Sequence, residues 1–294
     1  MPQRYQGVCR PQERRAALPK NFCRQGAGFL QTLPVCKLFF RSVHLAALDL
    51  EGFKMSFLGG YIFRNFVKEK IAQLYATFEY AANHPYAVLN KKARDASVVF
   101  IEATCPRAVA VRSPRRLMDV ALTRVSLDGL FLEFGVFKGA SIRYIAKKNP
   151  NREVHGFDSF QGLPEQWAHN PVGTFTTHGK LPKVPTNVQL WQGYFEDSLP
   201  QWTKNHDRTI AFLHIDCDLR SSTKTILDHL AKNIRHGTVI VFDDYFNFPG
   251  WQDDGHAVLT EFLEKNQFSA EYIGYGFKEL AIIIRPLLSD EHSN

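Results

Sequence analysis

Five aspartates in the second half of the sequence lie within three residues of the end of a short apolar run that predicts a β-strand. They are Asp158 after residues 154–157, Asp216 and Asp218 after residues 210–215, and Asp243 and Asp244 after residues 238–242. Ligands of parallel sheets bind beyond the carboxyl ends of the strands, so these side chains should meet at one rim. Clustered carboxylates repel one another unless a cation compensates them. Their hard oxygens suit Mg²⁺ or Mn²⁺ rather than zinc, so the pattern predicts a divalent-cation site, with helix capping and loop hydrogen bonding as the alternative.

A glycine-bearing loop joins the first predicted strand of the sheet to a helix. Residues 130–134 form the apolar run, Gly135 and Gly139 bracket the loop, and residues 141–148 predict the helix. Glycines let a ligand approach the backbone and the amides at a helix N-terminus. Asp158, about 20 residues further on, suits a ribose diol. The unit predicts a nucleoside-type cofactor site, with tight turns that bind no ligand as the alternative.

Residues 129–286 alternate between strand and helix patterns. This order predicts a doubly wound α/β domain with a mostly parallel, seven-stranded, Rossmann-like sheet. Ser221 is expected to cap the helix that follows it. Residues 159–186 are too long for an ordinary connection and are expected to serve the site. The predicted strands are 130–134, 154–157, 188–192, 210–215, 238–242, 270–273 and 280–285, and the predicted helices are 141–148, 195–202, 222–233 and 254–266.

The sequence before residue 129 divides into two parts. Residues 55–128 show helical periodicity, with a helix start at Ser113-Pro114, and predict a helical layer on the sheet. A lid and a dimerisation surface are the alternatives. Residues 1–54 carry nine Lys or Arg against three Asp or Glu, which is +6 of the total net charge of +7. They are expected to be a disordered basic tail, with an Arg-rich presequence or non-native sequence upstream of Met55 as alternatives. Residues 287–294 are expected to be a polar tail.

Composition excludes some partners. The chain after residue 54 is nearly neutral, with no basic stripe, which argues against nucleic acid. A mean hydropathy of −0.24 and the lack of a long apolar run argue against a membrane span. The five cysteines form no CxxC pair, so a reducing, cytoplasmic location with a buried, reduced Cys217 is expected. The sequence leaves the oligomeric state open, a homo-oligomer included.

The glycine-bearing loop also limits which class of cofactor can bind. A dinucleotide dehydrogenase would carry G-x-G-x-x-G, whereas here Glu133 precedes Gly135-x-x-x-Gly139. E-x-G-x-x-x-G is the arrangement of S-adenosylmethionine (SAM) enzymes with this fold. On these and further motifs, residues 130–285 resemble the TylF/MycF-type O-methyltransferases, the macrocin and related sugar-hydroxyl methylating enzymes. The matching motifs are FLEFGVFKGAS, GFDSFQGLPE, GYFEDSLP, HIDCDLRSST and VIVFDDYFNFPGW.

The resemblance implies roles for particular residues. The family often has Trp-Arg-Gly-Gly at residues 137–140 and Tyr in place of Arg220, so the acceptor need not be an antibiotic sugar. The implied metal ligands are Asp216, Asp243 and Asp244, with Asp218 as general base. The implied SAM-binding residues are Glu133, Gly135, Gly139 and Ser141 in the loop, Asp158 and Ser159 at the ribose, and Asp197 near the adenine.

The reaction implied is metal-dependent methyl transfer from SAM to a hydroxyl of a sugar or another small molecule with a vicinal diol. Mg²⁺ would bind two neighbouring hydroxyls and lower the pKa of one of them. Asp218, or a histidine from a mobile loop, would take the proton. The candidate histidines are His169, His178 and His256, with a surface position as the alternative. Phe248 and Trp251 could wall the acceptor pocket, with packing as the alternative.

Other functional classes stay open at this point. In a DxD glycosyltransferase, Asp216 and Asp218 would hold Mn²⁺ and a nucleotide sugar. A HAD-type phosphatase is disfavoured because its DxDx[TV] motif should end the first strand and not the fourth. A non-catalytic cofactor-binding relative is a third class, and the intact acidic residues argue against it.

Overall fold

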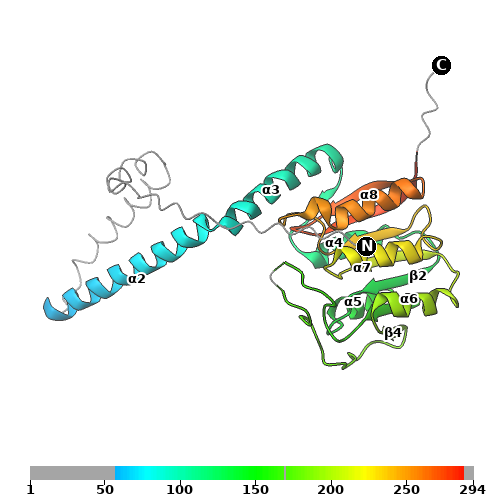
Figure 1. Ribbon diagram of the computed structural model, residues 1–294, viewed down its shortest axis with the longest axis horizontal. Helices are drawn as coiled ribbons and strands as arrows, with labels where there is room; N and C mark the ends of the chain where they lie inside the picture. The colour runs from blue at the N-terminus through cyan, green and yellow to red at the C-terminus, as the bar shows by residue number, and fades with distance from the viewer. Residues whose placement is uncertain (1–56, 169, 288–294) are drawn as a thin grey trace, which may run out of the picture. The chain divides into compact units, whose positions relative to one another are not determined.

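The computed structural model describes residues 57–168 and 170–287 (Figure 1). The predictions made for residues 1–54, for the end of the polar tail and for His169 lie outside the described residues. The chain divides into two compact units, residues 1–76 and 77–294. Helix α2 (Phe57–Asn83) crosses this boundary, and every other described element belongs to the second unit.

An eight-stranded sheet forms the centre of the second unit. Its order is β1-β7-β8-β6-β5-β2-β3-β4, and all pairings are parallel except those of β8 with β6 and β7. This confirms the doubly wound, mostly parallel fold. The one additional strand, β1, has only two residues, which is too short to show a strand pattern. The strands are β1 (Val109–Ala110), β2 (Leu130–Phe134), β3 (Val154–Asp158), β4 (Val188–Gln192), β5 (Ile210–Ile215), β6 (Val239–Phe242), β7 (Phe268–Tyr275) and β8 (Leu280–Pro286).

Helix α4 (Pro114–Thr123) begins at a side-chain cap and a proline. The Ser113 side chain accepts a hydrogen bond from the Arg116 amide, and proline occupies the first turn, which confirms the predicted helix start. The capping role expected for Ser221 is wrong, because its helix begins one residue earlier and its hydroxyl instead donates to Glu165, at 2.5 Å. The remaining helices are α3 (Pro85–Thr104), α5 (Ala140–Lys148), α6 (Phe195–Thr203), α7 (Arg220–Leu230), α8 (Gly255–Lys265) and the 3₁₀ turn η3 (Trp251–Asp253).

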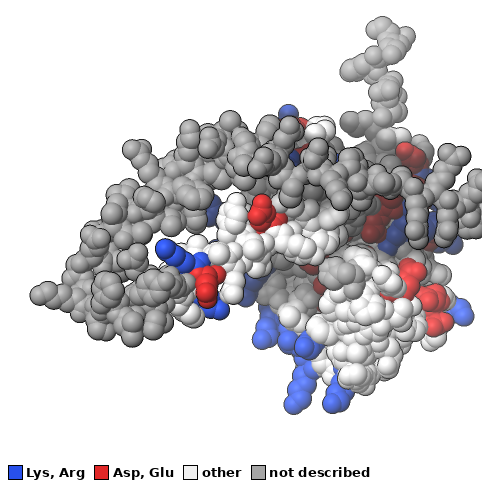
Figure 2. All heavy atoms as spheres, turned by 60° about the vertical axis from the view of Figure 1, so that its left-hand side comes forward, with Lys and Arg blue, Asp and Glu red and all other residues white. Residues whose placement is uncertain are grey.

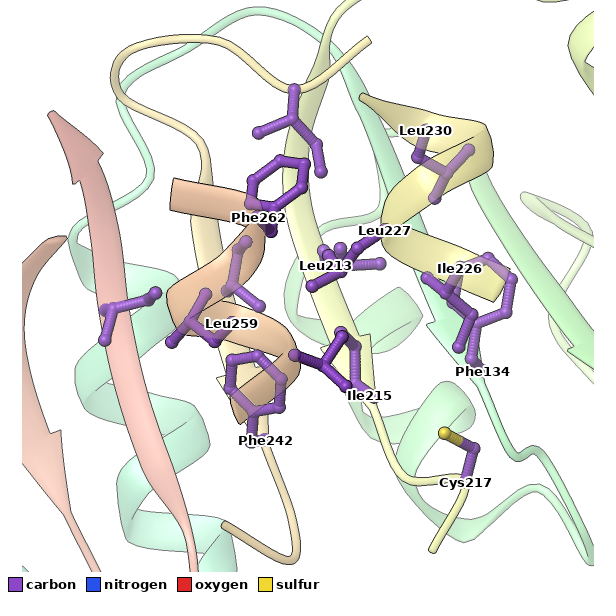
Figure 3. Packing of buried hydrophobic residues seen from close by; sticks show 14 of the residues in the cluster. Phe134, Leu213, Ile215, Cys217, Ile226, Leu227, Leu230, Phe242, Leu259 and Phe262 are labelled. Carbon is purple, nitrogen blue, oxygen red and sulfur yellow. The ribbon is translucent and has the colours of Figure 1, made fainter. Parts of the chain in front are cut away.

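Two hydrophobic cores lie on opposite faces of the sheet. On one face, side chains of α7 and α8 such as Leu227 and Phe262 meet Leu213 and Ile215 of β5 (Figure 3). On the other face, α5 packs against β3, and α4 packs against β6, β7 and β8. All six residues of β5 are buried as a result, which is the pattern of a central parallel strand. Two covered faces leave the carboxyl rim of the strands as the place for a ligand.

Helix composition, surface charge and the thiols can be described for the residues that the structure covers. Among the described residues, no helix combines the length and the apolar character that crossing a membrane requires. Lys and Arg and also Asp and Glu side chains reach the face shown in Figure 2. Cys105 and Cys217 are free and buried. Burial raises the pKa of Cys105 to about 11 and that of Cys217 still further, so both thiols stay protonated.

A buried histidine on β3 should make stability depend on pH. Trp191 Nε1 donates to His155 Nδ1, at 3.0 Å, and His155 Nε2 lies 3.0 Å from Glu153 Oε1. Burial lowers the pKa of His155 below 6.5, against the opposing charge of Glu153 and with help from His206 and Arg208. The unfolded chain therefore takes up a proton that the folded protein does not.

The stability that neutral His155 supplies is present above pH 6.5 and is lost as the pH falls through that value. Urea unfolding should show a steeper loss between about pH 7.5 and about pH 5.5 in the wild type than in His155→Gln. His229→Gln, on an exposed position of α7, should keep the wild-type slope. Equal slopes in the wild type and His155→Gln would contradict the assignment.

Candidate active site

The register of β5 and β6 brings two of the predicted acidic residues together. Ile215 pairs with Phe242, so Asp216 and Asp243 follow at neighbouring positions. The Asp243 amide donates to the Ile215 carbonyl, at 3.0 Å, which extends the ladder by one step. Each side chain emerges where its strand ends, as expected for the carboxyl rim of a parallel sheet.

A cavity of about 370 Å³ opens at this rim. One end is bordered by the glycine loop and by the end of β3, and the other end by the residues after β5 and β6. Of the residues predicted from sequence, the wall contains Gly135, Asp158, Ser159, Asp216, Asp218, Asp243 and Asp244. Glu133, Gly139, Ser141 and Asp197 are not part of the wall.

Gly135 is required by the neighbouring strand. Its φ is +94°, a region that favours glycine. A Cβ here would collide with the backbone carbonyl of Asp216. The Gly135 amide donates to the Phe157 carbonyl, at 3.0 Å, and so links the loop to β3. The glycine therefore lets three strand ends converge, a reason that the sequence pattern did not indicate.

Asp158 fixes the glycine loop. Its Oδ2 accepts from the Phe137 amide at 2.7 Å, and its Oδ1 accepts from the Phe160 amide at 2.6 Å. Phe137 has a φ of +47°, an unusual value for a non-glycine residue. The two amides hold the carboxylate at the cavity wall, where its remaining lone pairs can accept hydrogen bonds from hydroxyl groups of a ligand.

Glu133 and His214 form a buried pair behind the loop. Glu133 Oε1 accepts from Ser141 Oγ at 3.0 Å, and Oε2 lies 3.0 Å from His214 Nδ1. Burial by itself would lower the pKa of His214. The hydrogen bond and charge of Glu133, with the charges of Asp216 and Asp243, instead raise it to about 9. His214 is thus a protonated cation at neutral pH, and these contacts satisfy both its hydrogen bonding and its charge.

The aspartates at the rim raise one another's pKa, because each negative charge makes ionisation of its neighbours less favourable. Burial raises the pKa of Asp216 well above its ordinary value, and Asp243 adds to this rise. Burial, followed by the charge and hydrogen bond of Asp244, raises the pKa of Asp218 to about 7. Burial also raises the pKa of Asp243, against the opposing charge of His214. The cluster therefore holds more negative charge than its surroundings compensate.

One lysine supplies part of the missing positive charge. Lys278 Nζ lies 2.9 Å from Asp244 Oδ1, and it lines the cavity. Asp218 has a φ of +61°, so the chain after β5 turns sharply at a residue that lines the site. The ligand atoms of His214, Asp216 and Asp243 lie within 4.8 Å of one another. Since His214 is protonated, the two carboxylates are the available metal ligands of that set.

Comparison with known proteins identifies the domain. Residues 132–245 match the sequence model of a family described as "Methyltransferase domain". This segment is similar in sequence to methyltransferase domains. The match covers the glycine loop, Asp158 and all four clustered aspartates, and it confirms the resemblance that the sequence motifs indicated.

Individual relatives are more distant. A tetracenomycin methyltransferase of Streptomyces olivaceus, named 8-demethyl-8-(2,3-dimethoxy-alpha-L-rhamnosyl)-tetracenomycin-C 4'-O-methyltransferase, is 27% identical over 146 residues, 40% of this chain and 54% of the relative. The chain thus matches about half the length of that relative. Solved structures with lower similarity include the calicheamicin methyltransferase CalS11, with a TM-score of 0.49, 18% identity, and coverage of 73% of this chain and 92% of that chain. The O-methyltransferase NovP has a TM-score of 0.45 and 24% identity, with coverage of 58% and 79%.

Other predicted residues lie away from the cavity of the methyltransferase domain. Asp197 is exposed in the first turn of α6, and its neighbour Glu196 lines the cavity instead. His256 Nδ1 lies 2.8 Å from the Tyr245 hydroxyl in a largely buried aromatic cluster. Trp251 is 2% exposed in that cluster, so packing explains it. His178 is exposed, and neither it nor His256 belongs to the cavity wall.

Several cavity residues of the methyltransferase domain carry no sequence signal. Lys278 belongs to the turn between β7 and β8, which the chain order places far from the acidic motifs. Trp167 and Phe175 come from the 159–186 segment, which was predicted to serve the site through Ser159, His169 or His178 and not through these aromatic residues. Glu196 was missed although its helix was predicted to begin at the observed residue, because the resemblance assigned its neighbour Asp197 instead.

Proposed function

We propose that the protein is a SAM-dependent O-methyltransferase that methylates one hydroxyl of a sugar or of another small molecule with a vicinal diol. One observation carries this proposal: a shared cavity joins the glycine loop and Asp158 to four clustered aspartates. The methyltransferase domain supports the reaction class and speaks against a glycosyltransferase role for Asp216 and Asp218. The curated relative is named for methylation of a rhamnosyl sugar, which supports a sugar acceptor.

SAM would bind at the end of the cavity that the glycine loop borders. Asp158 and Ser159 would accept or donate hydrogen bonds at the ribose, and Gly135 would border the methionine part. Glu133, Gly139 and Ser141 would act from behind this wall by shaping the loop, because Glu133 is fully buried and bonded to Ser141.

The donor set fits a divalent cation of the Mg²⁺ type. Asp216, Asp243 and Asp244 offer hard oxygens, and their mutual repulsion is relieved only in part by His214 and Lys278. These three aspartates would hold the ion. When bound, it would lower the pKa of an acceptor hydroxyl and fix the direction of that hydroxyl.

The remaining chemistry falls to Asp218 and to the cavity itself. Bound SAM would supply an activated methyl group, and transfer of that group to the acceptor oxygen would leave the electron pair of the carbon–sulfur bond on sulfur, as S-adenosylhomocysteine (SAH). Asp218, which lines the cavity beside the proposed metal ligands, would take the hydroxyl proton. Holding both reactants in one cavity supplies much of the rate enhancement.

Calorimetry and methyl-transfer assays test the proposal. SAM and SAH should bind with micromolar affinity, and UDP-sugars should not bind. Radiolabelled methyl transfer to sugar and catechol-like acceptors should stop in excess chelator and return with Mg²⁺, whereas SAH binding should persist in chelator. Activity that survives chelation would contradict the metal part alone. A protein that binds UDP-sugars and not SAM would overturn the function.

A further inference from the structure

The main chain of Lys278 is tied to the segment that carries the acidic residues after β6. Its carbonyl accepts from the Tyr245 amide at 2.9 Å and from the Phe246 amide at 3.4 Å. The Asn247 side chain donates to the neighbouring Phe277 carbonyl, at 2.8 Å. These bonds join the β7–β8 turn to the rim of the sheet, so the position of Lys278 relative to the aspartates is set by the backbone.

The side chain of Lys278 is held on three sides. Its Nζ lies 2.9 Å from Asp244 Oδ1, 5.5 Å from the ring centroid of Trp167 and 5.9 Å from that of Phe248. The two rings meet edge to face, with centroids 6.3 Å apart. Lys278 and Trp167 both line the cavity, and the Lys278 side chain keeps 34% of its exposure.

This arrangement is more than a surface ion pair. An exposed ion pair contributes little, whereas Lys278 is fixed by a half-buried carboxylate and by two aromatic faces. An ammonium has three N–H donors, and Asp244 takes one of them. The others are available to a ligand in the cavity.

The surrounding charge limits what that ligand can be. Four carboxylates share this end of the cavity, and an anionic acceptor would be repelled by them. A neutral oxygen, in a hydroxyl or a ring ether, suits the free N–H groups of Lys278. The Trp167 ring beside it offers a flat apolar surface on which the C–H face of a sugar ring can lie.

We propose that Lys278 binds the acceptor, donating a hydrogen bond to a third oxygen of a neutral pyranose that lies on Trp167 while two neighbouring hydroxyls face the aspartates. The inference rests on the proposed function and adds the acceptor class and a residue that selects it. Lys278 contacts the acceptor in this arrangement. If its role were only structural, it would hold the loop near Trp167 in place without contacting the acceptor.

A cycle that combines enzyme variants with acceptor analogues separates these roles. The acceptors are methyl rhamnopyranoside and its three singly deoxygenated forms, and binding to the enzyme with SAH and Mg²⁺ is measured by calorimetry or saturation-transfer NMR. Lys278→Met keeps the apolar stem and removes the charge and the donors, and Lys278→Arg keeps both. Lys265→Met, which removes an exposed ion pair between Lys265 of α8 and Asp228 of α7, is the control.

We expect the wild type to lose about 10- to 100-fold in affinity when one particular hydroxyl is removed, the usual worth of a hydrogen bond to a charged group. Lys278→Met should bind the parent sugar more weakly by that factor and should not respond to the same deletion. Lys278→Arg should retain most of the response, and Lys265→Met all of it. SAH affinity should stay within about twofold throughout.

Each other outcome decides against the inference. If Lys278→Met still responds fully to every deletion, or loses SAH affinity and thermal stability along with sugar affinity, Lys278 is structural only. If the wild type binds SAH but none of these pyranosides, the acceptor is not a neutral pyranose. If it binds neither SAM nor SAH, the proposed function fails instead.

Discussion

Asp243→Asn should abolish methyl transfer and leave both the fold and SAH binding nearly intact. Asparagine keeps the size of the side chain and removes the charge that a divalent cation needs. Losing an electrostatic contribution at the reacting atoms costs on the order of 10²–10³ in rate, and losing the cation as well should exceed this. Radiolabelled methyl transfer to acceptors of the wild type and calorimetry with SAH measure the two effects separately.

The same substitution should not destabilise the protein. Burial raises the pKa of Asp243, and Asp244 and Glu279 add to the rise, so the folded state tolerates this charge poorly. Neutral asparagine relieves that repulsion, and the melting temperature should rise or stay constant. Asp207→Asn, at an exposed position before the opposite end of β5, should change neither property. A loss of this size should leave on the order of 1% of the wild-type activity or less. More than about a tenth of wild-type activity in Asp243→Asn would therefore contradict a metal role.

The acidic half of the site could be predicted because each carboxylate is local to a strand end. An apolar run followed by aspartate predicts both the strand and the rim on which the side chain emerges. The parallel register of neighbouring strands then brings these aspartates together. Asp216, Asp218, Asp243 and Asp244 all border the cavity for this reason. The fold class, a doubly wound and mostly parallel sheet, followed from the alternation of strands and helices.

The acceptor half could not be predicted, because its residues meet only through the fold. Lys278 approaches Asp244 from a hairpin turn, and Trp167 approaches from a loop whose length was the only indication of a role. Neither position belongs to a periodic pattern. Ser221 shows the reverse error: a good capping residue beside a predicted helix, which instead bonds to Glu165 of the same loop.

Gly135 was predicted correctly for an incomplete reason, and the difference can be measured. The motif suggested room for a ligand, but a Cβ at Gly135 would collide with the Asp216 carbonyl at the end of β5. Gly250 offers a matched control, since its φ of +84° is close to the +94° of Gly135 and no atom lies within 4 Å of its hypothetical Cβ. The two sites therefore share backbone strain, and only Gly135 adds a collision.

Gly250→Ala should destabilise the protein by about 1–2 kcal/mol, the cost of a left-handed backbone for a residue with a Cβ. Gly135→Ala should cost several kcal/mol more, because relief requires moving the end of β5 or the glycine loop. Urea unfolding measures both. Asp216 directly follows β5 and would move with the end of that strand. Gly135→Ala should therefore also lose methyl transfer at temperatures where it remains folded. Equal destabilisation by the two alanines would mean that the end of β5 can move at little energetic cost. The aspartates that follow β5 would then not be held in fixed positions.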